Sequence, residues 1–260
     1  MKTACVIGNS HIGAIKSGWD RIDEASRPVA LEFFGSKSQS LQRTFVEDGV
    51  LKSDDEQIQR SLLRTGGAPE IDLRRYDMFV LVGGGVHFKA LGRMLRNATL
   101  YPDATPGRRL VSQPALTEAF RRRVEALAAW DLSVMISSVT DAPIYVLPEP
   151  FFDKDVMKAT HKPFMKQIHE LGIGEQAAAA FDAACERTFS RFGGFVAQPR
   201  ETREDHIFTA SKYALAPVSM RRMMDMDLDA RDDDFVHKND EYGELMMRAF
   251  LALAGLSASK

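Results

Sequence analysis

Ser10 stands where a short buried run gives way to a segment with helical spacing. The apolar residues 4–7 and Gly8 precede it, and the stretch after it is amphipathic. A serine at such a place fits two chemistries. Its hydroxyl can accept a hydrogen bond from the first turn of the helix, as an N-cap. It can also act as a nucleophile, held at the end of a strand with helix N–H groups around its oxygen. The rest of the chain distinguishes the two.

A nucleophilic serine needs a base, and the base needs an acid that orients it. Of the six histidines, only His237 has an aspartate three residues before it, Asp234. A turn can bring positions i and i+3 to the same side, so Asp234 could accept the Nδ1 proton while Nε2 faces a hydroxyl. The pair also precedes the last helical segment, where a loop would return to the sheet. Its place in the chain therefore indicates a catalytic pair more strongly than its spacing does.

Short apolar runs alternate along the chain with amphipathic stretches, which is typical of a parallel sheet covered on both faces. Strands are predicted at 3–8, 28–35, 76–85, 142–150 and 193–199, and helices at 116–139, 165–192 and 239–255. Residues 36–75 are expected to hold one helix and much loop. In such folds, ligands bind beyond the carboxyl ends of the strands, at the switch in strand order. This rule places Ser10, Gly35, Gly85 and His87 near one edge of the sheet.

The composition excludes several classes of protein. A formal net charge of −2, with 27% charged residues, gives no bulk attraction to nucleic acid or to an anionic membrane. No run reaches the roughly 18 apolar residues of a membrane span. Because the first strand begins by about residue 3, there is no room for a cleavable leader, and a cytoplasmic protein is expected. Cys5 lies in that strand, which predicts a buried free thiol instead of a disulfide.

Four blocks resemble those of the SGNH (GDSL-like) hydrolases, in the same order: "IGNSHIGA", the glycine that ends "LEFFG", "LVGGGVH", and "DFVH" before the final helix. The resemblance covers residues 3 to about 256. It implies that Ser10 is the nucleophile and donates an oxyanion N–H, that Gly35 supplies another, and that Asp234 and His237 complete a triad. The fold it implies is a three-layer α/β/α sandwich with a five-stranded, mainly parallel, flavodoxin-like sheet. We expect one domain, 1–260, with insertions at about 36–75 and 88–115.

The third block departs from the family pattern. Where the family has Gly-x-Asn, this chain has Gly85, Val86 and His87, so the asparagine that donates to the oxyanion is absent or is replaced by a histidine. His87 is either a solvent-facing loop residue or a substitute oxyanion donor, and we predict the second. The first block also reads Gly-Asn-Ser-His in place of Gly-Asp-Ser-Leu, which is a milder change.

No metal or other cofactor is predicted. Residues 225–234 have some of the aspartate spacing of a calcium loop, but Ala230 and Val236 occupy positions that need Gly and Glu. His161 and His169 lack a clear third ligand for zinc. Four methionines between 220 and 226 are candidates for an apolar substrate lining, with core packing as the alternative.

These residues support a serine esterase for short-chain, acetyl-like esters of a small molecule or a carbohydrate. Two alternatives stay open at this point. The same triad could pass the acyl group to another alcohol, as an O-acyltransferase. The altered third block could instead mark a binding protein that has kept the hydrolase fold. The sequence contains no signal for the oligomeric state.

Overall fold

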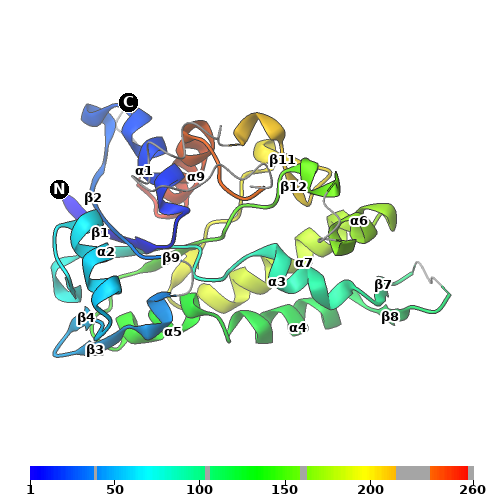
Figure 1. Ribbon diagram of the computed structural model, residues 1–260, viewed down its shortest axis with the longest axis horizontal. Coiled ribbons are helices and arrows are strands. Elements are labelled where there is room, and N and C mark those ends of the chain that lie inside the picture. Colours follow the sequence, from blue (N-terminus) through cyan, green and yellow to red (C-terminus); the bar gives the residue numbers. More distant parts are fainter. Residues whose placement is uncertain (38–39, 103–105, 159–162, 215–234, 257–260) are drawn as a thin grey trace.

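Five parallel strands form the central sheet of the computed structural model, in the order β10-β9-β6-β1-β2 (Figure 1). The structure describes residues 1–37, 40–102, 106–158, 163–214 and 235–256. The strands of the sheet are β1 (Lys2–Gly8), β2 (Val29–Gly35), β6 (Met78–Val82), β9 (Ile144–Leu147) and β10 (Gly193–Phe195). This arrangement confirms the predicted α/β class, the five strands and the flavodoxin-like order.

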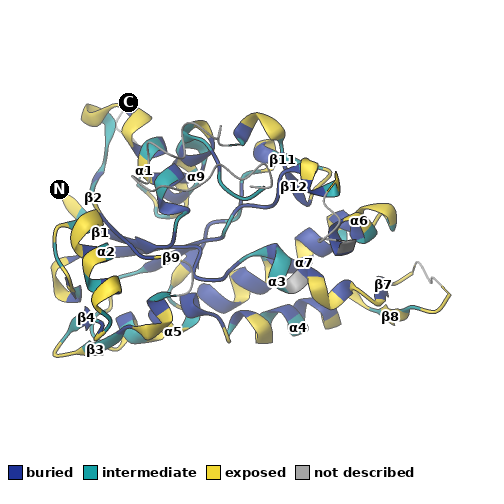
Figure 2. Cartoon of the chain, viewed as in Figure 1, coloured by how far each residue is buried: buried dark blue, intermediate teal, exposed yellow. Residues whose placement is uncertain are grey.

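The sheet ends at one level along its carboxyl edge. Gly8 pairs with Gly35 on one side and with Val82 on the other, and Val82 pairs with Leu147. The inner strands are continuous apolar runs, and residues 4–7 of β1 are fully buried, as expected for a sheet covered on both faces (Figure 2). The strand order reverses beside β1, since β2 lies on one side of it and β6 on the other. The predicted ligand edge therefore lies after Gly8 and Val82.

Helices cover both faces of the sheet (Figure 1). On one face lie α1 (Ile12–Arg21) and α9 (Asp240–Leu253), packed on a core that includes Trp19 and Phe250. On the other face lie α2 (Glu56–Gly66), α4 (Gln113–Val124), α5 (Ala128–Ser137) and α7 (Gly174–Phe189). The larger core cluster, with Phe120 and Phe181, fills this second side.

Two glycines bring α1 and α9 into direct backbone contact. A Cβ on Gly18 would lie 2.1 Å from the backbone of Gly243 and Glu244, and one on Gly243 would lie 1.8 Å from the carbonyl oxygen of Ala14. No other residue type allows so close an approach. Arg21 adds hydrogen-bonded ion pairs to Asp240 (2.9 Å) and Glu244 (2.7 Å). Because α1 starts just after Ser10 and α9 just after His237, this contact helps to position both residues.

The two long helices predicted from periodicity are each interrupted. Residues 116–139 form α4 and α5, since the N–H of Ala129 bonds at 3.0 Å to the carbonyl of Gly84 instead of continuing α4. Residues 165–192 form α6 (Pro163–Glu170) and α7, separated by Gly172 in a left-handed conformation (φ +65°). The closing helix, predicted at 239–255, is confirmed as α9.

Each expected insertion holds elements of its own. In 36–75, a small antiparallel sheet accompanies α2, built from β3 (Phe45–Glu47), β4 (Val50–Lys52) and β5 (Ile71–Asp72). In 88–115 lie α3 (Phe88–Gly92) and the paired strands β7 (Ala98–Leu100) and β8 (Arg109–Val111). A short hairpin, β11 (Arg203–Glu204) and β12 (Phe208–Thr209), follows β10.

Cys5 and Cys185 are both buried free thiols, which confirms the prediction for Cys5. Among the residues described, no helix combines the length and the apolar composition needed to cross a membrane.

Candidate active site

Ser10 and His237 meet at the carboxyl edge of the sheet although they lie 227 positions apart in the sequence. His237 Nε2 lies 2.9 Å from Ser10 Oγ, and both residues are partly exposed. Ser10 is not the helix cap: α1 begins at Ile12, and its N-cap position is His11. The serine hydroxyl thus faces an imidazole, which is the geometry of a nucleophile and its base.

The segment that carries His237 is held on both sides of the histidine. Lys238, 1% exposed, donates hydrogen bonds to the Asp153 carboxylate and to the carbonyl of Phe235 (3.1 Å). The N–H of Asp153 returns a bond of 2.9 Å to the Phe235 carbonyl, and the Asn239 N–H bonds to the Tyr213 carbonyl at 2.9 Å. Asn239 also caps α9. The buried ammonium group of Lys238 therefore anchors the loop that presents His237.

Asp234 lies outside the described residues, as do the calcium-like stretch at 225–234 and the four methionines at 220–226. The third member of the triad stays a prediction. Because Nε2 of His237 contacts Ser10, Asp234 would have to accept a hydrogen bond from Nδ1 of the same ring.

Glu149 contributes a carboxylate that the sequence reasoning missed. Its Oε1 accepts a hydrogen bond from Asn9 Nδ2 at 2.9 Å, and its Oε2 lies 3.8 Å from His11 Nε2. Burial alone would raise the pKa of Glu149, but the His11 contact, the nearby His87 and the Asn9 amide outweigh it and lower the pKa to about 2. The carboxylate is therefore ionised at neutral pH and stabilises the residues on both sides of Ser10.

His11 links Glu149 to His237. Its ring stacks on that of His237 with centroids 5.1 Å apart and planes 28° apart. Its backbone N–H donates to Asn9 Oδ1 at 3.2 Å, which fixes the turn from β1 into α1. The stack defines one side of the His237 ring.

Three consecutive left-handed glycines follow β6. Gly83, Gly84 and Gly85 have φ values of +78°, +56° and +83°. A Cβ on Gly83 would lie 2.8 Å from the Asn9 side-chain amide, so this glycine leaves room for the link between Asn9 and Glu149. The turn delivers the chain to His87 at the same edge of the sheet.

The geometry of His87 specifies its protonation. The N–H of Ala90 donates to His87 Nδ1 at 2.8 Å, so the proton of the neutral ring lies on Nε2. Burial, together with nearby Lys89, His11 and Arg93, outweighs the Glu149 carboxylate and lowers the pKa of His87 below its usual value. A neutral imidazole with an Nε2–H donor suits the predicted oxyanion role, which stays a prediction.

The backbone N–H groups of Ser10 and Gly35, the predicted oxyanion donors, and of Gly85, a predicted substrate-binding or oxyanion residue, differ in their hydrogen-bond partners. The N–H of Gly35 donates to Thr65 Oγ1 at 2.8 Å, so an oxyanion role for Gly35 would require that bond to be exchanged. The N–H groups of Ser10 and Gly85 bond to no other group in the described part of the chain. Ser10 and Gly85 are therefore better placed than Gly35 to donate to an oxyanion. A donor role for any of the three stays a prediction.

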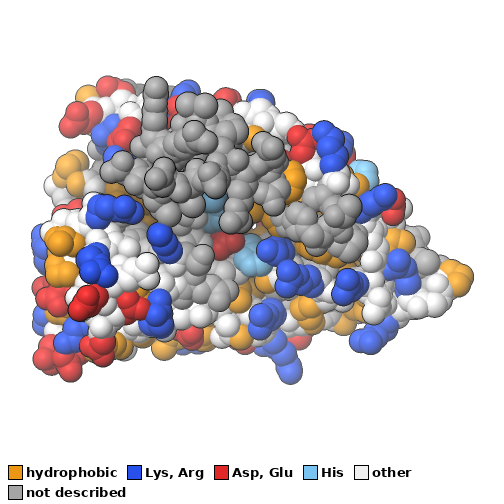
Figure 3. All heavy atoms as spheres, viewed as in Figure 1, with side chains coloured by type: hydrophobic (Ala, Val, Ile, Leu, Met, Phe, Trp, Pro, Cys, Tyr) orange, Lys and Arg blue, Asp and Glu red, His pale blue; other side chains and the backbone are white. Residues whose placement is uncertain are grey.

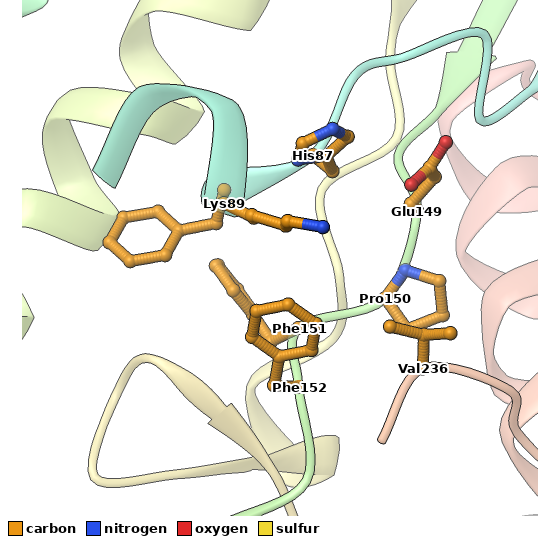
Figure 4. A pocket seen from close by; sticks show the side chains of 8 residues that line it. His87, Lys89, Glu149, Pro150, Phe151, Phe152 and Val236 are labelled. Atoms are coloured by element: carbon orange, nitrogen blue, oxygen red, sulfur yellow. The ribbon is translucent and has the colours of Figure 1, made fainter. Parts of the chain in front are cut away.

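A pocket of about 170 Å³ shares parts of its lining with this site: Glu149 bonds to Asn9, which precedes Ser10, and Val236 precedes His237 (Figure 4). Three segments line it: the start of α3 with His87, the chain after β9 with Glu149, and the chain before His237. Its residues are His87, Phe88, Lys89, Glu149, Pro150, Phe151, Phe152 and Val236. Over the described ranges, no three His, Cys, Asp or Glu side chains come together in a group that could hold a metal ion.

Known proteins resemble this chain only distantly. No protein-family model and no curated protein matches it. An acetyl-xylooligosaccharide esterase from Geobacillus stearothermophilus is 11% identical, with a TM-score of 0.37 over 100% of this chain and 96% of the other. A carbohydrate esterase family 2 enzyme with a carbohydrate-binding domain, from Corynascus thermopiles (Myceliophthora fergusii), is 14% identical, with a TM-score of 0.38 over 98% and 67%. A lipase/acylhydrolase from Enterococcus faecalis is 11% identical, with a TM-score of 0.33 over 100% of each chain. At such identities and TM-scores, the fold assignment rests on the sheet order and the functional assignment on the site itself.

Proposed function

We propose that this protein is a serine esterase that hydrolyses short-chain, acetyl-like esters of a small molecule or a carbohydrate. The observation that carries the proposal is the 2.9 Å contact between Ser10 Oγ and His237 Nε2 at the switch in strand order. The hydroxyl faces the ring nitrogen that would take its proton, and both side chains reach solvent.

The proposed reaction uses Ser10, His237 and Asp234 as a triad. Ser10 Oγ attacks the ester carbonyl while its proton moves to His237 Nε2, and Asp234 holds the imidazolium through Nδ1. N–H groups of Ser10 and Gly85 and the Nε2–H of His87 stabilise the oxyanion. His237 then gives its proton to the leaving alkoxide, which leaves an acyl group on Ser10. Water attacks the acyl-enzyme through the same base, and the carboxylic acid departs.

The size of the pocket supports a small substrate. Its volume of about 170 Å³ is less than the roughly 300–1,000 Å³ of sites for drug-sized ligands. Pro150, Phe151 and Val236 restrict its walls. Acetate esters should therefore be turned over better than esters of long fatty acids.

The test is the hydrolysis of 4-nitrophenyl acetate, butyrate and octanoate, with acetylated xylose as a sugar ester. We expect the highest kcat/KM with acetate and no turnover above background for Ser10→Ala. Raising the concentration of an added alcohol tests acyl transfer, since a transferase would form the new ester in place of free acetate. If wild type and Ser10→Ala are equally inactive on every ester, the proposal is wrong and a binding role is favoured.

A further inference from the structure

The pocket lined by Glu149 and Val236 contains a cation as well as aromatic walls. Lys89 enters it from the first turn of α3, and its Nζ lies 6.0 Å from the centre of the Phe152 ring. In Figure 4 the ammonium group points into the space between His87 and Phe151. Within the described residues, no carboxylate lies at ion-pair distance from Lys89 Nζ. The charge is thus presented to the pocket.

A second cation, Arg93, follows Lys89 by four residues, just after the end of α3. Both charges act on His87, which lines the pocket. Figure 3 shows Lys and Arg side chains around the middle of this face, beside histidine and acidic side chains.

The carboxylate of Glu149, which lines the pocket, already has hydrogen-bonding partners on the side away from Lys89. Glu149 accepts from Asn9 at 2.9 Å and lies 3.8 Å from His11, so its charge is directed toward the turn that carries Ser10. Figure 4 shows Lys89 and Glu149 on different sides of the pocket. A ligand can therefore reach the lysine without displacing an internal ion pair.

Aromatic side chains hold the walls around the lysine in place. Phe88 and Phe151 pack edge to face with ring centroids 5.2 Å apart, and both pack on Phe181 of α7. The space between these walls has a volume of about 170 Å³, which suits a small acidic group.

We propose that this pocket binds an anionic group of the substrate, a carboxylate or a phosphate, and that Lys89 pairs with it. The inference rests on the proposed esterase function and narrows its substrate to small esters that carry a negative charge. Charge-assisted hydrogen bonds to an ammonium are stronger than neutral ones, and aromatic walls exclude competing water.

The experiment compares esters that differ in charge but little in size. The first pair, 4-acetoxybenzoate and 4-acetoxybenzamide, places the charge on the alcohol part. The second pair, mono-4-nitrophenyl succinate and 4-nitrophenyl butyrate, places it on the acyl part. The readout is the ratio of kcat/KM for the anion to that for its neutral counterpart, in wild type, Lys89→Met and Lys89→Arg. Lys2→Met is the matched control, because Lys2 begins β1 at the opposite edge of the sheet.

We expect wild type to prefer the anion of one pair by about tenfold or more, which is the size of effect that a hydrogen bond to a charged group supplies. Lys89→Met should remove most of that preference, Lys89→Arg should keep most of it, and Lys2→Met should leave it unchanged. A ratio near one for both pairs in wild type, or a ratio that Lys89→Met does not change, would overturn the inference while leaving the esterase function intact.

Binding to Ser10→Ala separates this inference from the function it rests on. Calorimetric titration of that variant with 4-acetoxybenzoate and 4-acetoxybenzamide needs no turnover. If no ester is hydrolysed by wild type, the esterase proposal fails. In that case, anion binding by the pocket is supported if 4-acetoxybenzoate binds more tightly than 4-acetoxybenzamide and Lys89→Met abolishes the difference. Equal binding of the two compounds refutes it.

Discussion

The two sides of Ser10 are built in different ways. On the base side, residues 235–239 bring His237 to the serine, held by the buried Lys238 and by the packing of α9 on α1 at Gly18 and Gly243. On the oxyanion side, residues 83–89 begin with three left-handed glycines, which lead to His87 and the start of α3. In sequence, "DFVH" before α9 resembles the last SGNH block, whereas Gly85, Val86 and His87 depart from the Gly-x-Asn of the third block. Buried packing thus positions His237 beside Ser10, whereas the glycine turn and Glu149 set the position and the electrostatic surroundings of His87.

The largest effect is expected on the base side. Ser10→Ala and His237→Ala should each lower kcat for 4-nitrophenyl acetate by roughly 10⁴- to 10⁶-fold, because both disable the same proton transfer. The double variant should be scarcely slower than either single one. Steady-state rates corrected for spontaneous hydrolysis check this. A double variant whose loss equals the product of the two single losses would show that His237 serves a different step.

The anchor of the base side should matter for stability. Lys238→Met removes one partner of an ion pair whose side chains are 0% and 6% exposed, which leaves Asp153 buried without it and costs about 3–5 kcal/mol. Arg248→Met, in a pair with Glu244 whose side chains are 56% and 20% exposed, should cost less than about 1 kcal/mol. Urea unfolding measures both. Equal losses would mean that the buried pair is no stronger an anchor than a surface one.

On the oxyanion side, His87→Ala should lower kcat by about 10²- to 10³-fold with little change in KM, since one oxyanion donor contributes about 2.7–4 kcal/mol. His87→Asn should recover much of the loss by restoring an N–H donor. Because the pKa of His87 is lowered, its ring is neutral above about pH 6.5. The rate ratio of wild type to His87→Asn should therefore stay constant from there to about pH 9. A kcat for His87→Ala within a factor of about three of wild type would make His87 a bystander.

The smallest effect is expected from Glu149→Gln, which should lower the free energy of unfolding by about 1–3 kcal/mol. The amide oxygen still accepts a hydrogen bond from Asn9, but the charge that faces His11 is lost. The pKa of Glu149 lies at about 2 in the folded protein, below its ordinary 4.5. Its stabilisation is thus present above about pH 4.5 and is lost as the pH falls toward 2. Unfolding free energies of wild type and Glu149→Gln should converge over that range, whereas the exposed Glu201→Gln should show no such trend. A difference that does not depend on pH would contradict a charge effect.

Sequence patterns predicted the parallel sheet because each of its strands is a nearly continuous apolar run. The breaks in the helices were not predictable in the same way. Periodicity continues through residues 125–127, and the interruption arises only when Ala129 bonds to Gly84, a contact between distant segments. Gly172 was a visible signal for the other break, since glycine at a helix end often adopts the left-handed conformation that ends it.

At the site, the order of the blocks predicted the meeting of Ser10 and His237. Glu149 was missed because a single carboxylate after a strand has no spacing pattern, and its contacts depend on the register that aligns Leu147 with Val82 and Gly8. Its place after β9, at the same edge as Ser10, was the available signal. The hydroxyl partner of Gly35 was likewise hidden, since Thr65 reaches it from the end of α2.

The most direct test of the account is covalent labelling of the intact protein with a fluorophosphonate, followed by peptide mass mapping. A serine activated by His237 should react, so one label should appear on the peptide that contains Ser10. The label should be absent in Ser10→Ala and strongly reduced in His237→Ala. A label on another residue, with Ser10→Ala retaining full esterase activity, would contradict the assignment of Ser10 as the nucleophile.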